Sequence, residues 1–308
     1  MKKKSIGIIG PGNHFINRIY PVLQKLNYFK VLGILRKRNI KFKNIKNLKE
    51  KEFFNKKFDF IYISCPNKKH ENYIIKSLMA GSHVICEKPF VVRKKNINKI
   101  VKLAQEKKRL IFETFMYVYH PVFKYVEKLI REKRYGKLQY LISNFRYPSL
   151  KKNNNRYKKE EGGGFFYDAG SYLISLENFL FNNRNRKNIK TYLQKIKNNV
   201  DLRGNIFINS PRGNRFYFWG EGQNYSNNLE IFFDKATIHV DKFFSKSKNE
   251  IIKMNIYASN KKQKIFSEVD QFEKMFYTVQ KNYKKKSFQN FHAKKIRNQL
   301  DLLVSYNI

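Results

Sequence analysis

The chain has 308 residues, 42% of them hydrophobic and 16% aromatic, which excludes global disorder and allows two domains with packed cores. No apolar run approaches the roughly 20 residues of a membrane-spanning helix, and the two cysteines, Cys65 and Cys86, are too few for a disulfide framework and lack metal-ligand spacing. The net charge of +42 is spread over every segment, which favours a compositional bias over a specific nucleic-acid-binding function.

The first part of the chain alternates short apolar runs with helical patterns. The expected strands are residues 5–9, 31–35, 59–64, 82–86 and 110–113, and the expected helices are residues 15–26, 70–80 and 96–107. Gly81 is placed to end the second of these helices as a left-handed cap. Continuous apolar strands separated by helices predict a parallel sheet covered on both faces. We therefore expect residues 1–119 to form an α/β domain of the doubly wound, Rossmann type.

The pattern changes after residue 119. The expected elements are a helix over residues 122–132, a strand over 137–147, a helix over 167–181, several strands within 188–257, and helices over 268–282 and 291–305. Turn residues between the strands of 188–257, with no clear helix, predict a mainly antiparallel sheet. Residues 120–308 are thus expected to form an α+β domain with a large open sheet.

The turn after the first strand reads Gly10-Pro11-Gly12-Asn13-His14. Gly10 allows a tight turn, and Gly12 lets the backbone approach a pyrophosphate at a helix N-terminus. Phe15 stands where the dinucleotide-binding fingerprint has a small third residue, so the match is partial. A plain strand-helix connection is the alternative interpretation of this turn.

The second strand ends in Leu35-Arg36-Lys37-Arg38. An NAD-selective fold usually has an acidic residue there for the ribose hydroxyl, whereas basic residues suit the 2′-phosphate of NADP. Because lysine and arginine occur throughout this sequence, Arg36 and Lys37 favour NADP over NAD only modestly.

Several later segments carry motifs that occur together in one family. They are Pro66-Asn67 and His70 after the third strand, Glu87-Lys88-Pro89 after the fourth, Glu113-Thr-Phe-Met-Tyr117 with His120-Pro121, the run Gly162-Gly-Gly164 followed by Asp168 and Tyr172, and Asp270–Phe276. This ordered set, which covers essentially the whole chain, resembles the glucose-fructose oxidoreductase / inositol dehydrogenase (Gfo/Idh/MocA) family. Many members of the family have His at the position of Tyr172. A Tyr there resembles the branch that contains glucose-fructose oxidoreductase and dimeric dihydrodiol dehydrogenase. Val118 departs from that branch, which often has Arg there.

The resemblance implies a hydride transfer between NAD or NADP and a sugar, a sugar derivative or a small cyclic alcohol or ketone. It carries over Lys88 as catalytic and Asp168 as substrate-binding. It also implies a cofactor site that includes Gly10, Gly12, Asn13, His14, Arg36, Lys37, Pro66, Asn67, His70, Glu87 and Lys88. No metal is implied.

The chemistry of Lys88 and Tyr172 can be argued from the residue types alone. A phenol has an ordinary pKa of about 10, and a nearby ammonium group favours the phenolate. Tyr172, from the second domain, would transfer the proton of the substrate's hydroxyl group. Lys88 would lower the pKa of the Tyr172 phenol and orient it. The alternatives are a solvated charge for Lys88, a packing role for Tyr172, a helix cap for Asp168 and an ion pair with Lys88 for Glu87. For the Lys88-Pro89 bond, trans is the default.

A non-catalytic dinucleotide-binding sensor on the same fold is the second hypothesis for the whole chain, and the presence of Lys88 and Tyr172 argues against it. One face of the predicted open sheet must be covered, and family members commonly pair through it, so we expect a homodimer or larger assembly. The basic N-terminal residues 1–4 mimic a signal peptide, but Gly10-Pro11-Gly12 interrupts the following apolar run too early. We expect a cytoplasmic protein with no membrane partner.

Overall fold

The computed structural model describes residues 3–36, 45–181 and 187–306 and divides the chain into two compact units. The first unit comprises Met1–Thr114 and Met275–Leu300, and the second comprises Phe115–Lys274 and Asp301–Ile308. Each unit is described by itself.

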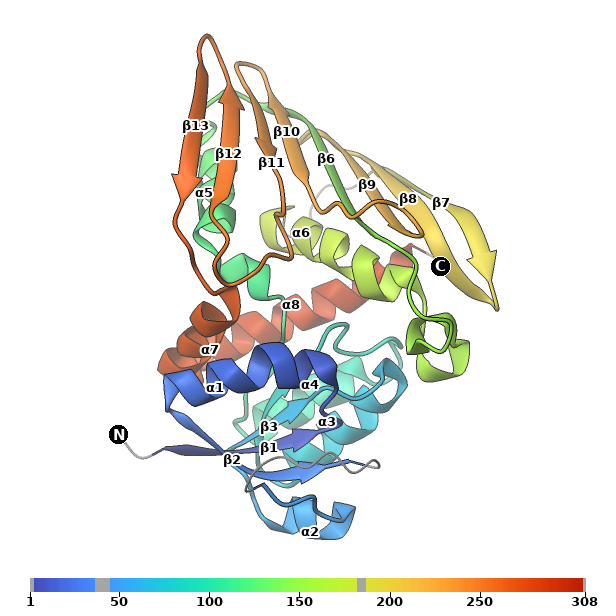
Figure 1. Cartoon of the computed structure of the whole chain (residues 1–308), viewed down its shortest axis with the longest axis vertical. Coiled ribbons are helices and arrows are strands. Elements are labelled where there is room, and N and C mark those ends of the chain that lie inside the picture. Colours follow the sequence, from blue (N-terminus) through green and yellow to red (C-terminus); the bar gives the residue numbers. More distant parts are fainter. Residues whose placement is uncertain (1–2, 37–44, 182–186, 307–308) are drawn as a thin grey trace. The chain divides into compact units, whose positions relative to one another are not determined.

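The first unit contains a parallel five-stranded sheet with helices along it (Figure 1), as the apolar runs predict. The strands are β1 (Lys4–Ile9), β2 (Phe29–Leu35), β3 (Phe60–Ile63), β4 (His83–Cys86) and β5 (Ile111–Glu113), in the order β2-β1-β3-β4-β5. The helices between them are α1 (Tyr20–Leu26), α2 (Glu50–Asn55), α3 (His70–Met79) and α4 (Ile97–Glu106). The strand order reverses between β1 and β3, which is where doubly wound sheets bind ligands.

Two helices from the end of the chain belong mainly to this first unit. They are α7 (Gln271–Asn282) and α8 (Lys286–Ser305). Ala293, Ile296 and Leu300 of α8 join the same apolar core as the sheet strands. This differs from the expected division after residue 119, which assigned everything beyond it to one domain. The physical reason is that the apolar face of α8 is buried against the first unit, a pairing that a linear boundary does not capture.

One row of residues crosses the first sheet from edge to edge. The register pairs Leu35 with Ile9, Ile9 with Ile63, Ile63 with Cys86, and Cys86 with Glu113. The residue that follows each of these leaves its strand at the carboxyl end of the sheet, because the carboxyl ends of parallel strands lie side by side. This end of the sheet is the edge at which the site is described below.

The second unit is built on an eight-stranded sheet that is mainly antiparallel, with β6 and β9 as a parallel pair. Its strands are β6 (Leu138–Tyr147), β7 (Lys187–Lys197), β8 (Val200–Asn209), β9 (Asn214–Glu221), β10 (Leu229–Phe233), β11 (Thr237–Val240), β12 (Ile252–Tyr257) and β13 (Lys261–Phe266). The order is β13-β12-β11-β10-β6-β9-β8-β7, and the helices of this unit include α5 (Pro121–Glu132) and α6 (Ser171–Phe181). The predicted α+β architecture is confirmed, while β13 was not expected from the sequence.

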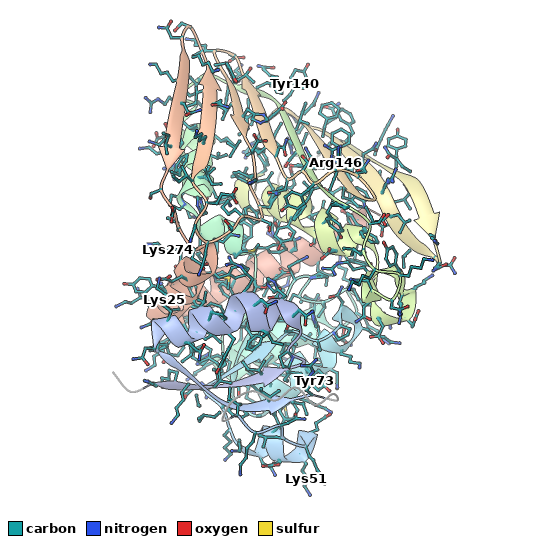
Figure 2. The ribbon with its side chains drawn as sticks, viewed as in Figure 1. Lys25, Lys51, Tyr73, Tyr140, Arg146 and Lys274 are labelled. Carbon is teal, nitrogen blue, oxygen red and sulfur yellow. The ribbon has the colours of Figure 1, made fainter. Side chains whose placement is uncertain are left out.

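The two faces of this sheet differ in burial. Along β6, Leu141, Ser143 and Phe145 are buried, whereas Tyr140 is 48% exposed and alternates with them. Helix α6 covers the buried face (Figure 1) and ties itself to β9 through Glu177. The opposite face carries Tyr140 and Arg146, which are labelled in Figure 2.

A fully buried ion pair joins α6 to the sheet. Glu177 accepts hydrogen bonds from Arg215 Nε at 3.0 Å and Nη2 at 2.8 Å, and from the Tyr217 hydroxyl at 2.9 Å. The side chains of both Glu177 and Arg215 are 0% exposed. Since a buried charge requires a partner, this network fixes α6 against β9.

The two edges of the sheet carry lysines. Strand β13 exposes Lys261, Lys262 and Lys264, and strand β7 exposes Lys190 and Lys197.

Within residues 3–36, 45–181 and 187–306, no helix is both long and apolar enough to cross a membrane.

Replacement of Arg215 by Met is expected to lower the free energy of unfolding by about 3–5 kcal/mol, because it leaves the Glu177 carboxylate buried without its cation. The matched control is Lys124→Met, which removes an exposed pair with Glu127 and should cost at most about 1 kcal/mol. Urea unfolding at constant pH measures both. Equal, small losses would show that the buried pair does not anchor α6.

Candidate functional site

The glycine turn after β1 has the geometry that a dinucleotide site needs. Gly10 has φ +66°, and a side chain there would lie 2.6 Å from Cys65 Cβ. Gly12 has no atom within 4 Å of the position that a Cβ would occupy. Gly10 therefore serves the turn itself, whereas Gly12 leaves open space beside the start of the helix, where a pyrophosphate can approach the backbone.

Phe15, which stands where the dinucleotide-binding fingerprint has a small residue, is buried in the core of the first unit. The ring is 0% exposed and packs against Tyr62 of β3, with ring centroids 5.5 Å apart. The first helix begins as a π-helical turn, Phe15–Ile19, before the α-helix starts at Tyr20. A helix–strand contact made through a large ring thus replaces the close packing that a small residue gives.

The expected cofactor residues Asn13 and His14 lie exposed at the start of this helix. His14 Nε2 is 3.8 Å from the Glu87 carboxylate, so the turn after β1 reaches the residue that follows β4. Arg36 directly follows β2, and its backbone is held by two hydrogen bonds to Asn47. Lys37, its expected companion, lies outside the described residues.

His70 connects two of the predicted cofactor segments. Its ring is 0% exposed, with Nδ1 2.9 Å from the carbonyl oxygen of Pro89 and Nε2 2.8 Å from that of Cys65. Burial lowers the pKa of His70, and the hydrogen bonds to these carbonyl groups oppose that shift. Because Cys65 precedes the predicted Pro66-Asn67 turn, His70 holds the turn after β3 to the turn after β4.

Glu87 is fixed by side chains from the neighbouring strands. It accepts hydrogen bonds from the hydroxyl groups of Tyr62 on β3 and of Thr114 after β5, the latter at 2.9 Å. These contacts make Glu87 a link between the ends of β3, β4 and β5. Lys88 itself follows Glu87 at this edge, and the Lys88-Pro89 bond is cis rather than the default trans.

Tyr172 belongs to the second unit and lies in an aromatic environment. It is 8% exposed, and its hydroxyl group is 3.5 Å from Met116 Sδ. The rings of Phe115, Phe145 and Phe244 have centroids 5.1–5.8 Å from that of Tyr172. The packing role proposed for this residue is therefore real, and it gives the phenol one fixed orientation.

Asp168 lies within the π-helical turn Phe166–Gly170, one turn before Tyr172. Its carboxylate accepts hydrogen bonds from Arg156 Nε at 2.6 Å and Nη2 at 3.1 Å, and from the Tyr147 hydroxyl at 2.6 Å. Asp168 raises the pKa of Arg156, and burial, followed by Asp168, raises that of Tyr147. Asp168 is thus an oriented anion inside the turn rather than the N-cap of the helix.

The glycine run 162–164 is required by the packing of the preceding loop. A side chain at Gly163 would lie 2.6–2.7 Å from three carbonyl oxygens of residues 155–158. Gly164 has φ +116°, and its Cβ would lie 2.7 Å from Asp201 Oδ1. Asp201 in turn accepts hydrogen bonds from the Phe166 amide at 2.7 Å and the Trp219 indole at 2.6 Å. Asp201 therefore fixes the start of the turn that carries Asp168 and Tyr172.

Several supporting residues were not assigned from the sequence. Asp201 had little signal, since along β8 it lies with Arg203 and Asn205 on the more polar side of the strand, and only its burial in the structure distinguishes it. Arg156 had none, because the loop around it is as basic as the rest of the chain, and its guanidinium group binds Asp168.

The family comparison covers both units. The description "Oxidoreductase family, NAD-binding Rossmann fold" of the Gfo/Idh/MocA group matches residues 4–115, and its C-terminal domain matches residues 123–239. The chain belongs to the Gfo/Idh/MocA family of oxidoreductases.

Curated relatives are similar at lower identity. A dTDP-3,4-didehydro-2,6-dideoxy-alpha-D-glucose 3-reductase from Streptomyces violaceoruber is 27% identical over 50% of this chain and 45% of its own length. Its counterpart from Saccharopolyspora spinosa is 24% identical over 61% of this chain and 57% of its own length. A trans-1,2-dihydrobenzene-1,2-diol dehydrogenase from Xenopus laevis is 24% identical over 29% of this chain and 27% of its own length. The chain thus matches about half the length of the first two relatives and less of the third.

Solved structures share the fold over nearly the whole chain. A 3-ketoreductase from Actinomadura kijaniata, in complex with NADP and TDP-benzene, has a TM-score of 0.91 at 20% identity, covering 99% of this chain and 97% of the other. An aldose-aldose oxidoreductase from Caulobacter crescentus has a TM-score of 0.81 at 14% identity, with 99% and 97% covered. At these identities the likeness concerns the fold.

The two glycines of the first turn give a matched pair of variants. Gly12→Ala should leave the free energy of unfolding within about 0.5 kcal/mol of wild type, because its Cβ meets open space. It should weaken NADPH binding at least tenfold, about 1.4 kcal/mol, by blocking the pyrophosphate. Gly10→Ala should instead destabilise the free protein by more than about 1 kcal/mol through backbone strain and overlap with Cys65. Unfolding curves and fluorescence titrations measure these changes; unchanged binding by Gly12→Ala would move the pyrophosphate elsewhere.

Proposed function

We propose that the chain catalyses NADP(H)-dependent interconversion of a ketone and a secondary alcohol on a sugar or sugar derivative. The observation that carries this proposal is the edge of the first sheet, where the Gly10–Gly12 turn, the His70 connection and Lys88 all follow strands that end in one row. Curated relatives named as dTDP-sugar 3-reductases support a sugar derivative as substrate. A small cyclic diol, as in the relatives named dihydrobenzenediol dehydrogenases, is the other substrate class within the proposal.

The cofactor fits the residues present at this edge. Gly12 leaves the space that a pyrophosphate needs, and Arg36 follows β2 at the position that faces the adenosine ribose in this fold. We therefore propose NADP as the preferred cofactor, which accords with the NADP bound in the solved 3-ketoreductase. When bound, the nicotinamide ring supplies or accepts the hydride.

The chain's own residues then handle the proton and the substrate. We assign proton transfer to the Tyr172 hydroxyl group and the stabilising positive charge to the Lys88 ammonium group. Asp168, fixed by Arg156 and Tyr147, is proposed to accept a substrate hydroxyl group and so to select polyhydroxylated substrates. A sensor that binds the cofactor without turnover needs neither Lys88 nor Tyr172.

We further propose that two copies associate through the face of the large sheet that carries Tyr140. Tyr140 there contacts Phe216 and Phe232, each at a centroid distance of 6.5 Å, and Phe216 contacts Phe207 at 4.9 Å. An aromatic cluster of this kind on an exposed sheet face is typical of a protein interface. The thiols of Cys65 and Cys86, which are not joined in a disulfide, suit a reducing compartment, and we place the protein in the cytoplasm.

The function is tested by titrating the purified protein with NADPH and NADH and then assaying turnover of keto-sugars and dTDP-linked keto-sugars. We expect submicromolar binding with NADPH preferred. Lys88→Ala should reduce kcat at least a thousandfold, and Tyr172→Phe at least a hundredfold, with cofactor binding largely retained. Binding without turnover on the substrate panel would support the sensor, and failure to bind either cofactor would contradict both.

The association is tested by measuring the mass in solution at micromolar concentration. Tyr140→Glu should weaken the dimer at least tenfold, because it introduces a carboxylate into an aromatic contact. Tyr277→Glu is the control, since Tyr277 is 49% exposed, close to the 48% of Tyr140, but lies on α7. A monomeric wild type, or equal effects of the two substitutions, would refute the proposed interface.

A further inference from the structure

Glu113, the last residue of β5, has a contact that the mechanism above does not use. Its carboxyl group is buried, and its Oε1 atom accepts the backbone N–H of Phe90 at 2.7 Å. Phe90 lies two residues after Lys88 in the turn that follows β4. Glu113 is also directly paired with Cys86 in the sheet register. The carboxyl group of one strand therefore binds the turn that carries the ammonium group of its neighbour.

The charged and titratable groups around Glu113 come from three directions. Burial raises the pKa of Glu113, the hydrogen bond from the Phe90 amide and the charge of Lys88 in the bound turn lower it, and Glu87, directly after β4, raises it. The Cys86 thiol of β4 is fully buried, which raises its own pKa, so it stays neutral. His70 from α3 contacts the same turn at the Pro89 carbonyl oxygen.

Helix α8 packs against the adjacent position of β5. His292 lies against Phe112, with ring centroids 4.5 Å apart, and burial lowers the pKa of His292 to about 3. Lys295 acts in the same direction on His292. The ring of His292 is therefore neutral throughout the working pH range, and it adds no titration near that of Glu113.

We propose that Glu113 is a positioning residue that holds the Lys88 turn through the Phe90 amide and, by gaining or losing a proton, sets the net charge around the Lys88 ammonium group. This inference rests on the proposed function of Lys88. Phe90 finds its acceptor in either protonation state of Glu113, so the turn keeps its shape while the local charge changes.

The two protonation states of Glu113 differ in their effect on the positive charge of Lys88. Burial, the largest cause, raises the pKa of Glu113 to about 8. Below that pH the carboxyl group is neutral, and the positive charge of Lys88 acts undiminished on a developing oxyanion. Above it, the carboxylate opposes this charge, and turnover falls.

The test compares Glu113→Gln, Glu113→Ala and wild type across pH 6–10 with saturating NADPH and substrate. Gln retains the acceptor for the Phe90 amide but cannot ionise. We expect kcat of Glu113→Gln within about twofold of wild type at pH 7 and about tenfold above it at pH 9, one unit beyond the midpoint of about 8. Glu113→Ala should lower kcat at all pH values. The control is Asp59→Asn, which removes the negative charge of the ion pair with Lys4 at the amino ends of the strands and should leave the pH profile unchanged.

Two measurements test the role of Glu113 without requiring enzyme turnover. Hydrogen exchange of the 88–92 segment should be faster in Glu113→Ala and unchanged in Glu113→Gln. Carbon NMR of glutamate carboxyl groups should show a titration near pH 8 in wild type that is absent from Glu113→Gln. An identical alkaline limb in wild type and Glu113→Gln, or unaltered exchange in Glu113→Ala, would overturn the positioning role. If wild type shows no turnover at all, the proposed function fails while exchange and NMR still judge Glu113.

Discussion

The parallel register of the first sheet aligns five strand ends, and the placement of the first unit's functional groups depends on it. The row from Leu35 through Ile9, Ile63 and Cys86 to Glu113 makes the segments that follow these residues emerge side by side. Backbone hydrogen bonds in the ladder, rather than the functional side chains themselves, determine this alignment. Glu87, His70 and Glu113 then fasten neighbouring turns to one another, so the edge is cross-linked by polar contacts as well as aligned.

Acidic residues are scarce in this chain, 23 against 65 lysines and arginines, and the buried ones have specific partners. Glu113 binds a turn, Glu177 anchors α6, Asp201 accepts the Phe166 amide and Glu221 accepts the Tyr157 hydroxyl group. Among the described residues, these are the four buried acids. The excess positive charge thus lies mainly in exposed side chains, while carboxylates organise the interior. A carboxylate within an apolar strand is the more informative signal in so basic a sequence.

Much of the fold could be predicted because periodic burial is visible in the sequence. Apolar runs such as residues 59–64 identify parallel strands, and Gly81, with φ +79°, ends its helix as expected. Contacts between residues far apart in the chain leave no such periodic pattern in the sequence. Nothing in the basic loop distinguishes Arg156 as the partner of Asp168, and α8 has an apolar face that fits either unit until packing is known. The motif residues Lys88 and Tyr172 were found by resemblance, whereas the groups that orient their surroundings required coordinates.

The lysines on the two outer strands of the large sheet have a consequence for assembly. An open sheet ends in unpaired N–H and C=O groups, which can template the addition of another chain. A second copy placed along β13 would bring its own lysines beside Lys261, Lys262 and Lys264, and one placed along β7 would meet Lys190 and Lys197. The resulting repulsion disfavours filament growth by strand addition. Because salt screens such repulsion, the barrier to fibrillar aggregation falls as ionic strength rises.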